Sequence, residues 1–312
     1  MMKAIGLNQF GGPEVLQVLE LPSPAVGRGE ILIRVHAATV NPVDEMVRRG
    51  QAFVSDAQPP YVPGMEAAGI IEKIGDNTAT DLRVGDRVVA IVVVSGTHGA
   101  YAEQLAVPAE SVVRAPEGTT HNEATTMPMN GLTARMALDR LAVQSGDTVA
   151  IVGAAGAVGG YAVQLAKAEG LSVIADAAPH DVELVSKLGA DVVVPRGDDF
   201  AAYVRHEFPD GVDGLIDTAG RTLNVAGAVR DGGRIVTSAP LAPLITERDI
   251  VTERTFVPEY ARNQRALNQL RELVEKGDIS LRVARTFPAH EAAQAHRLLQ
   301  KGGLRGRIVL TF

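Results

Sequence analysis

Residues 148–160 read TVAIVGAAGAVGG, an apolar run that passes into a cluster of glycine and alanine. The run predicts a strand over residues 148–152, and residues 158–168 predict a helix that begins where the small residues end. Small residues between a strand and a helix let the backbone approach a pyrophosphate closely, and the helix N-terminus directs N–H groups at its negative charge. The segment therefore predicts a dinucleotide cradle, with contacts from Gly153, Ala155, Gly156, Ala157, Val158 and Gly159.

The glycine spacing in this cradle is ambiguous when taken alone. It follows G-x-x-G-x-x-G, so Ala154 stands where the first glycine of the usual G-x-G-x-x-G fingerprint would be. A bare glycine pattern also fits a tight turn with no ligand. A second apolar strand ends about twenty residues further on, as it does in dinucleotide-binding units. This context favours the cofactor site over the turn.

Strands and helices alternate on both sides of the cradle. Apolar strands are expected at 148–152, 171–175, 192–194, 214–217 and 234–236, and helices at 158–168, 182–188, 201–207 and 223–230. The strands are continuous apolar runs, typical of a parallel sheet that is covered on both faces. Residues 121–256 are therefore predicted to form a doubly wound dinucleotide-binding domain.

Polar and small residues follow two of the later strands. Thr218, Ala219 and Gly220 come after the strand at 214–217, and Ser238 and Ala239 come after the strand at 234–236. Doubly wound sheets bind their ligands at the carboxyl ends of the strands. These five residues are therefore further candidates for cofactor contacts, and ordinary loop chemistry is the alternative.

The first 120 residues show a different pattern of apolar and turn-forming residues. Short β-rich runs such as 31–35, 69–75 and 86–91 are separated by glycine and proline, which predicts an irregular, mostly antiparallel β domain. Near the other end, residues 263–276 predict an amphipathic helix stopped by Gly277, and residues 305–310 predict a strand. We expect this strand to rejoin the N-terminal domain, so residues 1–120 and 257–312 together would form the second domain.

Composition and charge exclude several classes of function. The 312 residues have a formal net charge of −7 with acidic and basic residues interspersed, which argues against nucleic acid as a partner. The longest unbroken apolar run, residues 88–94, is far shorter than the roughly 20 residues that span a bilayer. Residues 1–6 do not resemble a secretory signal. We expect a cytoplasmic protein with neither a nucleic-acid nor a membrane partner.

Several motifs in a fixed order resemble one family from end to end. They are FGGPEVL at 10–16, NPVD at 41–44, PGMEAAG at 63–69, GDRV at 85–88, GAYAE at 99–103, GLTA at 131–134 and LGAD at 188–191. With the cradle, they resemble the medium-chain dehydrogenase/reductase superfamily, in its zinc-free quinone oxidoreductase branch. The resemblance implies an α/β protein with a GroES-like catalytic domain and a Rossmann domain, an active site in the cleft between them, and a homodimer.

The resemblance also bears on zinc. In the zinc-dependent alcohol dehydrogenases, the matching positions have a Cys where this chain has Asn41 and a His where it has Met65. The chain contains no Cys at all, whereas a catalytic zinc needs about three thiolate, imidazole or carboxylate ligands. We therefore predict no metal site.

Hydride transfer to a conjugated acceptor suits a site without a Lewis acid. Nothing in such a site lowers the pKa of an alcohol, whereas reduction of a quinone or an enone yields an anion that its own conjugation stabilises. The family motifs imply Asn41 as a hydrogen-bond donor near the substrate, and Asn130 and Thr133 as contacts to the nicotinamide ribose or carboxamide. Asp44 is a further candidate, and capping the helix after Pro42 is its alternative role.

Cofactor preference rests on the end of the second strand of the cradle domain. NADPH users of this family have small residues there, followed by side chains that bind the 2′-phosphate. Here Asp176 and Ala177 occupy the strand end, and His180 and Arg196 are the cations within reach in the sequence. An acidic residue at this place would accept ribose hydroxyls and select NAD. The family habit favours NADPH, and NADH is the alternative.

Two other functions fit the same residues. The first is a reductase of alkenals, enones or enoyl thioesters, which the sequence does not separate from a quinone reductase. The second is a non-catalytic NADP-binding protein with a structural or regulatory role. Consumption of the reduced cofactor in the presence of an acceptor distinguishes the enzymes from the binding protein.

Overall fold

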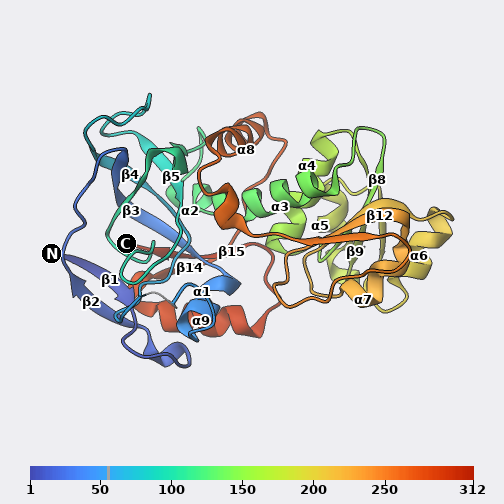
Figure 1. Ribbon diagram of the computed structural model, residues 1–312, viewed down its shortest axis with the longest axis horizontal. Coiled ribbons are helices and arrows are strands. Elements are labelled where there is room, and N and C mark those ends of the chain that lie inside the picture. The colour runs from blue at the N-terminus through green and yellow to red at the C-terminus, as the bar shows by residue number, and fades with distance from the viewer. Residues whose placement is uncertain (55–56) are drawn as a thin grey trace. The chain divides into compact units, whose positions relative to one another are not determined.

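The computed structural model describes residues 1–54 and 57–312, which divide into two compact units (Figure 1). Unit 1 comprises residues 1–129, 261–275 and 281–312, and it contains both ends of the chain. Unit 2 comprises residues 130–260 and 276–280. No helix among the described residues is long and apolar enough to cross a bilayer.

Unit 2 contains a six-stranded sheet in which every strand pair is parallel. Its strands, in spatial order, are β10 (Val192–Pro195), β9 (Ser172–Ala177), β8 (Thr148–Val152), β11 (Val212–Asp217), β12 (Val229–Thr237) and β13 (Val251–Arg254). This 3-2-1-4-5-6 order is that of a Rossmann sheet. The doubly wound fold predicted from the continuous apolar strands is therefore confirmed.

The helices of unit 2 connect these strands. They are most of α3 (Pro128–Leu141), then α4 (Ala157–Ala168), α5 (Val182–Lys187), α6 (Phe200–Glu207) and α7 (Thr222–Val225), with 3-10 turns at Pro179–Asp181, Ala226–Ala228 and Val257–Tyr260. The prediction of a helix over residues 223–230 is wrong for the second half of that range. The α-helix ends at Val225, and β12 begins at Val229. Gly227 lies between them, where a residue of low helix propensity does not prolong the helix.

Unit 1 is built on a mostly antiparallel sheet. Its strands are β3 (Glu30–Val40), β4 (Glu66–Ile74), β5 (Arg87–Ile91), β6 (Gln104–Pro108), β7 (Val112–Arg114), β14 (Val283–Pro288) and β15 (Arg307–Thr311), in the order β14-β15-β3-β4-β5-β7 with β6 also paired to β3. β1 (Met2–Gly6) and β2 (Gln17–Leu21) form a separate pair. β15 pairs with β3 in antiparallel register, which confirms that the C-terminal strand rejoins the N-terminal half.

The helices of unit 1 include the amphipathic one expected near the end of the chain. They are α1 (Pro42–Arg48), α2 (His121–Ala124), α8 (Gln264–Lys276, apart from its last residue) and α9 (Ala292–Lys301), with 3-10 turns at Pro13–Val15, Ala109–Ser111 and Ala289–Glu291. α8 ends where Gly277 adopts a left-handed φ of 83°. Leu267 and Leu270 form its buried face, so the periodicity of the segment gave the correct helix.

Two histidines of unit 1 stack face to face. The rings of His36 on β3 and His121 on α2 have centroids 4.6 Å apart and planes inclined by 11°. Burial, and then the neighbouring His36, lowers the pKa of His121 to about 4. The folded protein therefore keeps His121 neutral at pH values where an unfolded chain would protonate it.

Replacing His121 by Phe should make the stability of the protein less dependent on pH in mildly acidic solution. Because the folded pKa of about 4 lies below the ordinary value of 6.5, the unfolded chain binds the extra proton as the pH falls from 6.5 towards 4, and stability is lost over that window. His121→Phe keeps a ring against His36 and removes this proton. The drop in Tm between pH 7 and pH 5 should be smaller for the variant than for the wild type.

The same substitution at His206, whose side chain is 84% exposed, is the matched control and should leave the pH dependence as it is. Parallel Tm profiles for wild type and His121→Phe would show that the stacked pair does not titrate as described.

Candidate functional site

The predicted cradle joins β8 to α4 in unit 2. Gly153, directly after β8, has a φ of 82°, a conformation that favours glycine. Gly156 is the N-cap of α4, and no side chain caps the helix there. The N-terminal turn of α4, which includes Ala157, Val158 and Gly159, therefore presents its positive dipole end at the loop. This arrangement fits the pyrophosphate of a dinucleotide.

Close packing holds the loop in this shape. A Cβ atom on Gly159 would lie 2.2 Å from the carbonyl oxygen of Gly153 and 2.7 Å from its carbonyl carbon. Ala154 and Ala155 are fully buried. The sequence therefore has small residues here because helix and strand end approach more closely than a side chain would permit.

The ends of the later strands lie beside the cradle. Thr218 donates to the carbonyl oxygen of Val152 from its backbone N–H, at 3.0 Å, and from its hydroxyl, at 2.8 Å. The backbone N–H of Ser238 donates to the carbonyl oxygen of Asp217 at 3.0 Å. The structure thus brings the candidates Thr218, Ala219, Gly220, Ser238 and Ala239 together at the carboxyl ends of β8, β11 and β12.

Asp217, the last residue of β11, shapes this edge. Its carboxylate accepts from the backbone N–H of Ala219 at 2.9 Å and from the hydroxyl of Thr222 at 2.7 Å. It is completely buried, and Gly220 turns the chain with a φ of 71°. Asp217 therefore fixes the turn that follows β11.

Asp176 points back into the cradle. Its Oδ1 accepts from the backbone N–H groups of Gly153 and Ala154, at 2.6 and 3.2 Å, and its Oδ2 accepts from Nε of Arg196 at 3.0 Å. The residue is 2% exposed, whereas the side chain of Arg196 is 40% exposed. Asp176 therefore ties the end of β9 to the cradle and holds the Arg196 guanidinium at its edge.

The other candidates near β9 differ in exposure. Ala177 is buried as the last residue of β9, and its carbonyl oxygen accepts from the backbone N–H of Arg196 at 2.9 Å. His180 lies on the 3-10 turn Pro179–Asp181, with its side chain 74% exposed and its Nε2 3.5 Å from a carboxylate oxygen of Asp181. Two basic side chains thus lie near the strand end, and Asp176 orients Arg196.

A second set of polar residues lies in unit 1, where β3 ends and α1 begins. Asn41 is the N-cap of α1, and its amide nitrogen donates to Oγ1 of Thr39 at 2.9 Å and to Oε1 of Glu66 at 3.1 Å. The hydroxyl of Thr39 also donates to Oε1 of Glu66. Asn41 Oδ1 is buried and has no hydrogen-bond partner among the described residues.

This geometry differs from the donor role expected of Asn41. Both protons of the Asn41 amide are donated within the chain, one to the Glu66 carboxylate and one to the Thr39 hydroxyl oxygen. The Thr39 hydroxyl donates its own proton to Glu66. The atom left for a ligand is the acceptor Oδ1. The sequence identifies Asn41 as a candidate, but it does not specify which end of the amide the chain itself engages.

Glu66 is the residue that the sequence reasoning missed. It is completely buried, and its Oε2 accepts from the backbone N–H of Met129, in the first turn of α3, at 2.6 Å. Burial raises the pKa of this carboxyl, and hydrogen bonds from Thr39, Met129 and Asn41 oppose the rise. The sequence does contain a signal for this role. Glu66 stands between Met65 and two alanines where an otherwise apolar strand begins, and a carboxylate buried there needs hydrogen-bond partners.

Asp44 is also buried, and its contacts are with the chain itself. Its carboxylate accepts from the backbone N–H groups of Asn41 and Gly64, each at 2.8 Å, and from the hydroxyl of Tyr101 at 3.3 Å. Burial raises the pKa of Asp44 to about 7, although the two backbone hydrogen bonds lower it. These contacts favour the capping role over a substrate contact.

Asn130 and Thr133 lie three residues apart on α3, so they share one side of that helix. Both are buried, with Asn130 completely enclosed.

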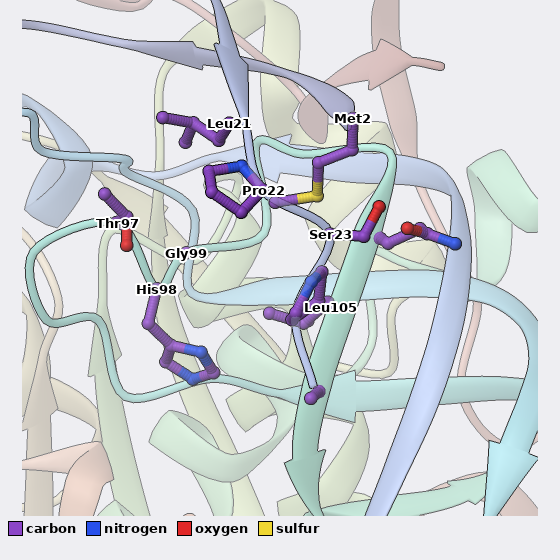
Figure 2. Close-up of a pocket in the computed structure, with 11 residues that line it drawn as sticks. Met2, Leu21, Pro22, Ser23, Thr97, His98, Gly99 and Leu105 are labelled. Atoms are coloured by element: carbon purple, nitrogen blue, oxygen red, sulfur yellow. The ribbon is translucent and has the colours of Figure 1, made fainter. Parts of the chain in front are cut away.

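A cavity of about 250 Å³ lies in unit 1, away from the candidate residues (Figure 2). It is lined by Met2, Leu21, Pro22, Ser23, Pro24, Thr97, His98, Gly99, Gln104, Leu105 and Ala106. None of the candidate residues lines this cavity. In the described part of the chain, no three His, Cys, Asp or Glu side chains group as metal ligands do.

Comparison with known proteins gives matches along the whole chain. Residues 27–117 match the family model of the alcohol dehydrogenase GroES-like domain, and residues 188–310 match that of zinc-binding dehydrogenases. Mouse quinone oxidoreductase is 30% identical over 99% of this chain and 98% of its own length. The chloroplastic NADPH-dependent alkenal/one oxidoreductase of Arabidopsis thaliana is 29% identical over 99% of this chain and 79% of its own length.

Solved structures give the same result. The mycobacterial protein Rv1454c in complex with NADPH has a TM-score of 0.87 and 30% sequence identity, with complete coverage of both chains. The fold expected from the sequence, a GroES-like domain with a Rossmann domain, is confirmed by these matches.

Substitution of Gly159 by Ala should weaken binding of the reduced cofactor by about 5- to 150-fold, the range to which 1–3 kcal/mol corresponds. The new Cβ would overlap the carbonyl of Gly153, and overpacking of this kind costs about 1–3 kcal/mol. Titration of the nicotinamide fluorescence gives the Kd directly. Ala168→Ser, at an exposed position of the same helix, is the control and should bind normally. Equal affinity of Gly159→Ala and wild type would remove the cradle from the binding site.

Proposed function

Because this chain belongs to the medium-chain dehydrogenase/reductase superfamily, in its quinone oxidoreductase-like branch, we propose that it is a zinc-independent reductase of quinones or other conjugated carbonyl compounds. It is an oxidoreductase that uses a nicotinamide cofactor. The observation that carries the proposal is the pair of side chains at the family's zinc-ligand positions. Asn41 is engaged by Thr39 and Glu66, and Met65 is a buried thioether, so neither supplies the thiolate or imidazole that zinc prefers.

The residues of unit 2 fit the proposed cofactor. The cradle and the N-terminus of α4 would hold the pyrophosphate, and Asn130 and Thr133 would hold the nicotinamide ribose or carboxamide. When bound, the reduced nicotinamide supplies the hydride. The protein then has to bind, orient and exclude water, since the conjugated acceptor delocalises the charge that develops on its oxygen.

The proposed cofactor is NADPH, and Arg196 is the residue proposed to bind its 2′-phosphate. The Asp176 carboxylate already accepts three hydrogen bonds, two of them from the cradle, which leaves it poorly placed to accept ribose hydroxyls. Its contact with Nε fixes the Arg196 guanidinium, whose terminal nitrogens lie on a 40% exposed side chain. An oriented guanidinium suits a phosphate.

Reduction of alkenals or enones is the second candidate, favoured by the identity with the Arabidopsis alkenal/one oxidoreductase. The test of both is the loss of absorbance of NADPH, and separately of NADH, with 1,4-benzoquinone, 9,10-phenanthrenequinone, a 2-alkenal and a cyclic enone. Faster turnover of the quinones supports the first proposal, and faster turnover of the alkenal or enone supports the second. Cofactor binding without turnover of any acceptor would favour the non-catalytic alternative.

Replacing Arg196 by Met should raise the Kd for NADPH by about 10- to 100-fold, the loss expected for charge-assisted hydrogen bonds to a phosphate. The Kd for NADH should change little, because NADH has no 2′-phosphate. Calorimetric titration with both cofactors measures the two effects. His180→Gln is the matched variant at the other basic side chain near this strand end and should leave the NADPH affinity unchanged. A selective loss in His180→Gln, or a wild type that prefers NADH, would contradict the assignment to Arg196.

A further inference from the structure

Three buried side chains of unit 1 form a continuous row of hydrogen bonds. Oδ2 of Asp44 on α1 lies 3.3 Å from the hydroxyl oxygen of Tyr101, and that oxygen lies 3.3 Å from Nε2 of His296 on α9. All three residues are completely buried. The row therefore connects α1 to α9 through groups that can each hold or pass on a proton.

The backbone holds Tyr101 in the middle of this row. Its N–H donates to the carbonyl oxygen of Pro63 at 3.0 Å. Its ring packs against Gly64, which has a φ of 104°, and a Cβ atom on Gly64 would lie 2.6 Å from Cδ1 of that ring. The rings of Tyr101 and His296 are perpendicular, with planes inclined by 89° and centroids 6.0 Å apart. The hydroxyl is thus fixed between Asp44 and His296.

The direction of these hydrogen bonds depends on whether Asp44 is ionised. An ionised carboxylate only accepts, so Tyr101 then donates to Asp44 and accepts from an N–H at Nε2 of His296. When Asp44 is protonated, its contacts among the described residues leave that proton one acceptor. The other contacts are backbone N–H groups, those of Asn41 and Gly64, so the proton must point at the Tyr101 oxygen. Tyr101 then donates to Nε2 of His296, and the imidazole proton lies on Nδ1.

Nδ1 of His296 is the open end of the row. It is buried and has no hydrogen-bond partner among the described residues. When Nδ1 takes up a proton, the imidazole can give its Nε2 proton to the Tyr101 oxygen, and Tyr101 can give its own proton to Asp44. The bonds at Nε2 and at the Tyr101 oxygen break, and new bonds form at Nδ1, at the Tyr101 oxygen and at Oδ2 of Asp44. The row thus gains the one proton that entered.

We propose that Asp44, Tyr101 and His296 are a proton relay, in which Asp44 stores the proton and His296 admits it. The inference goes beyond the proposed reductase function and does not depend on it, because all three residues belong to unit 1. Asp44 accepts the N–H of Asn41 in the capping box of α1. The relay therefore lets the charge at the start of α1 follow the pH although the carboxylate is buried.

Arg48 is the charged group that acts on the His296 end of the relay. Its side chain is completely buried, and Oε1 of Glu45 lies 3.8 Å from its Nη2. Burial, and then the charge of Arg48, lowers the pKa of His296 to about 3. A proton therefore does not stay on His296 near neutral pH and is passed on.

Glu66 is the charged group that acts on the Asp44 end. Burial raises the pKa of Asp44 to about 7, the backbone N–H groups of Asn41 and Gly64 oppose the rise, and the charge of Glu66 adds to it. Burial also raises the pKa of Tyr101 well above its ordinary value. The Tyr101 hydroxyl thus passes protons and stays neutral, and Asp44 is the group that stores one.

Nitrogen-15 NMR of the His296 ring tests the relay, because its signals show which ring nitrogen has the proton. From about pH 5 to about pH 9 the ring stays neutral, since its pKa is about 3, so only its tautomer can change. We expect the proton on Nδ1 at the acidic end and on Nε2 at the alkaline end, with a midpoint near the Asp44 pKa of about 7. His296→Gln identifies this ring among the seven histidines.

Tyr101→Phe interrupts the relay at its middle. The tautomer of His296 should then no longer follow the pH. The carboxyl carbon-13 resonance of Asp44 should titrate as two separate signals in place of one moving signal, because exchange of its proton becomes slow. Tyr61→Phe is the matched control and should behave as the wild type. Tyr61 is also buried in unit 1, but its hydroxyl donates to a backbone carbonyl, that of Ala57, at 3.0 Å.

A single tautomer of His296 throughout this pH range in the wild type would overturn the relay. So would a tautomer that still follows the pH in Tyr101→Phe. If Tyr101→Phe does not fold, His296→Gln serves instead, because an amide cannot admit the proton and Asp44 should again show two separate signals. One moving Asp44 signal in that variant would contradict the proposal.

Discussion

The constraint on which unit 1 depends is the burial of the Glu66 carboxylate. Three donors from three segments surround it, namely Thr39 at the end of β3, Asn41 at the N-cap of α1 and Met129 in the first turn of α3. None of these segments can shift without leaving a buried carboxylate short of a donor, which is far more costly than losing an exposed contact. A negative charge at the start of α3 is also favourable for the helix dipole. One side chain thus fixes the geometry of Asn41.

A second buried carboxylate reinforces the same region. Asp44 accepts from the backbone of Asn41 and of Gly64, and Gly64 lies two residues before Glu66. The two acids therefore connect the β3–α1 junction to the start of β4 in two ways. Asp44 does so through backbone N–H groups, and Glu66 does so through the side chains of Thr39 and Asn41. Burial raises the pKa of both, and their mutual repulsion contributes to the pKa of Asp44. Because the folded pKa of Asp44, about 7, lies above its ordinary value, this group destabilises the fold progressively as the pH rises from about 4 to 7.

The sequence was sufficient for the fold and for the strand, loop and helix of the proposed cradle, because these depend on patterns along the chain. Continuous apolar strands, the small residues at 153–160 and the strand at the C-terminus all specify backbone geometry. It was insufficient for side-chain direction. Asp176 was recognised by its spacing, but its turn toward the N–H groups of Gly153 and Ala154 depends on the path of the loop. The network around Glu66 was likewise not predictable, since Glu66 lies 27 residues from Thr39 and 63 residues from Met129 in the chain.

The side chains at Asn41 and Met65 have a consequence for the proposed choice of substrate. A reductase must accommodate negative charge on the acceptor's oxygen as hydride arrives, and zinc or an amide donor would do so in a site that contained them. Here the amide protons of Asn41 are engaged by Thr39 and Glu66, and Met65 stands at the second zinc-ligand position. The charge then has to be dispersed by the acceptor molecule itself. A quinone does this through its conjugated ring and an isolated ketone does not, so the side chains at these two positions favour the substrate class that we propose.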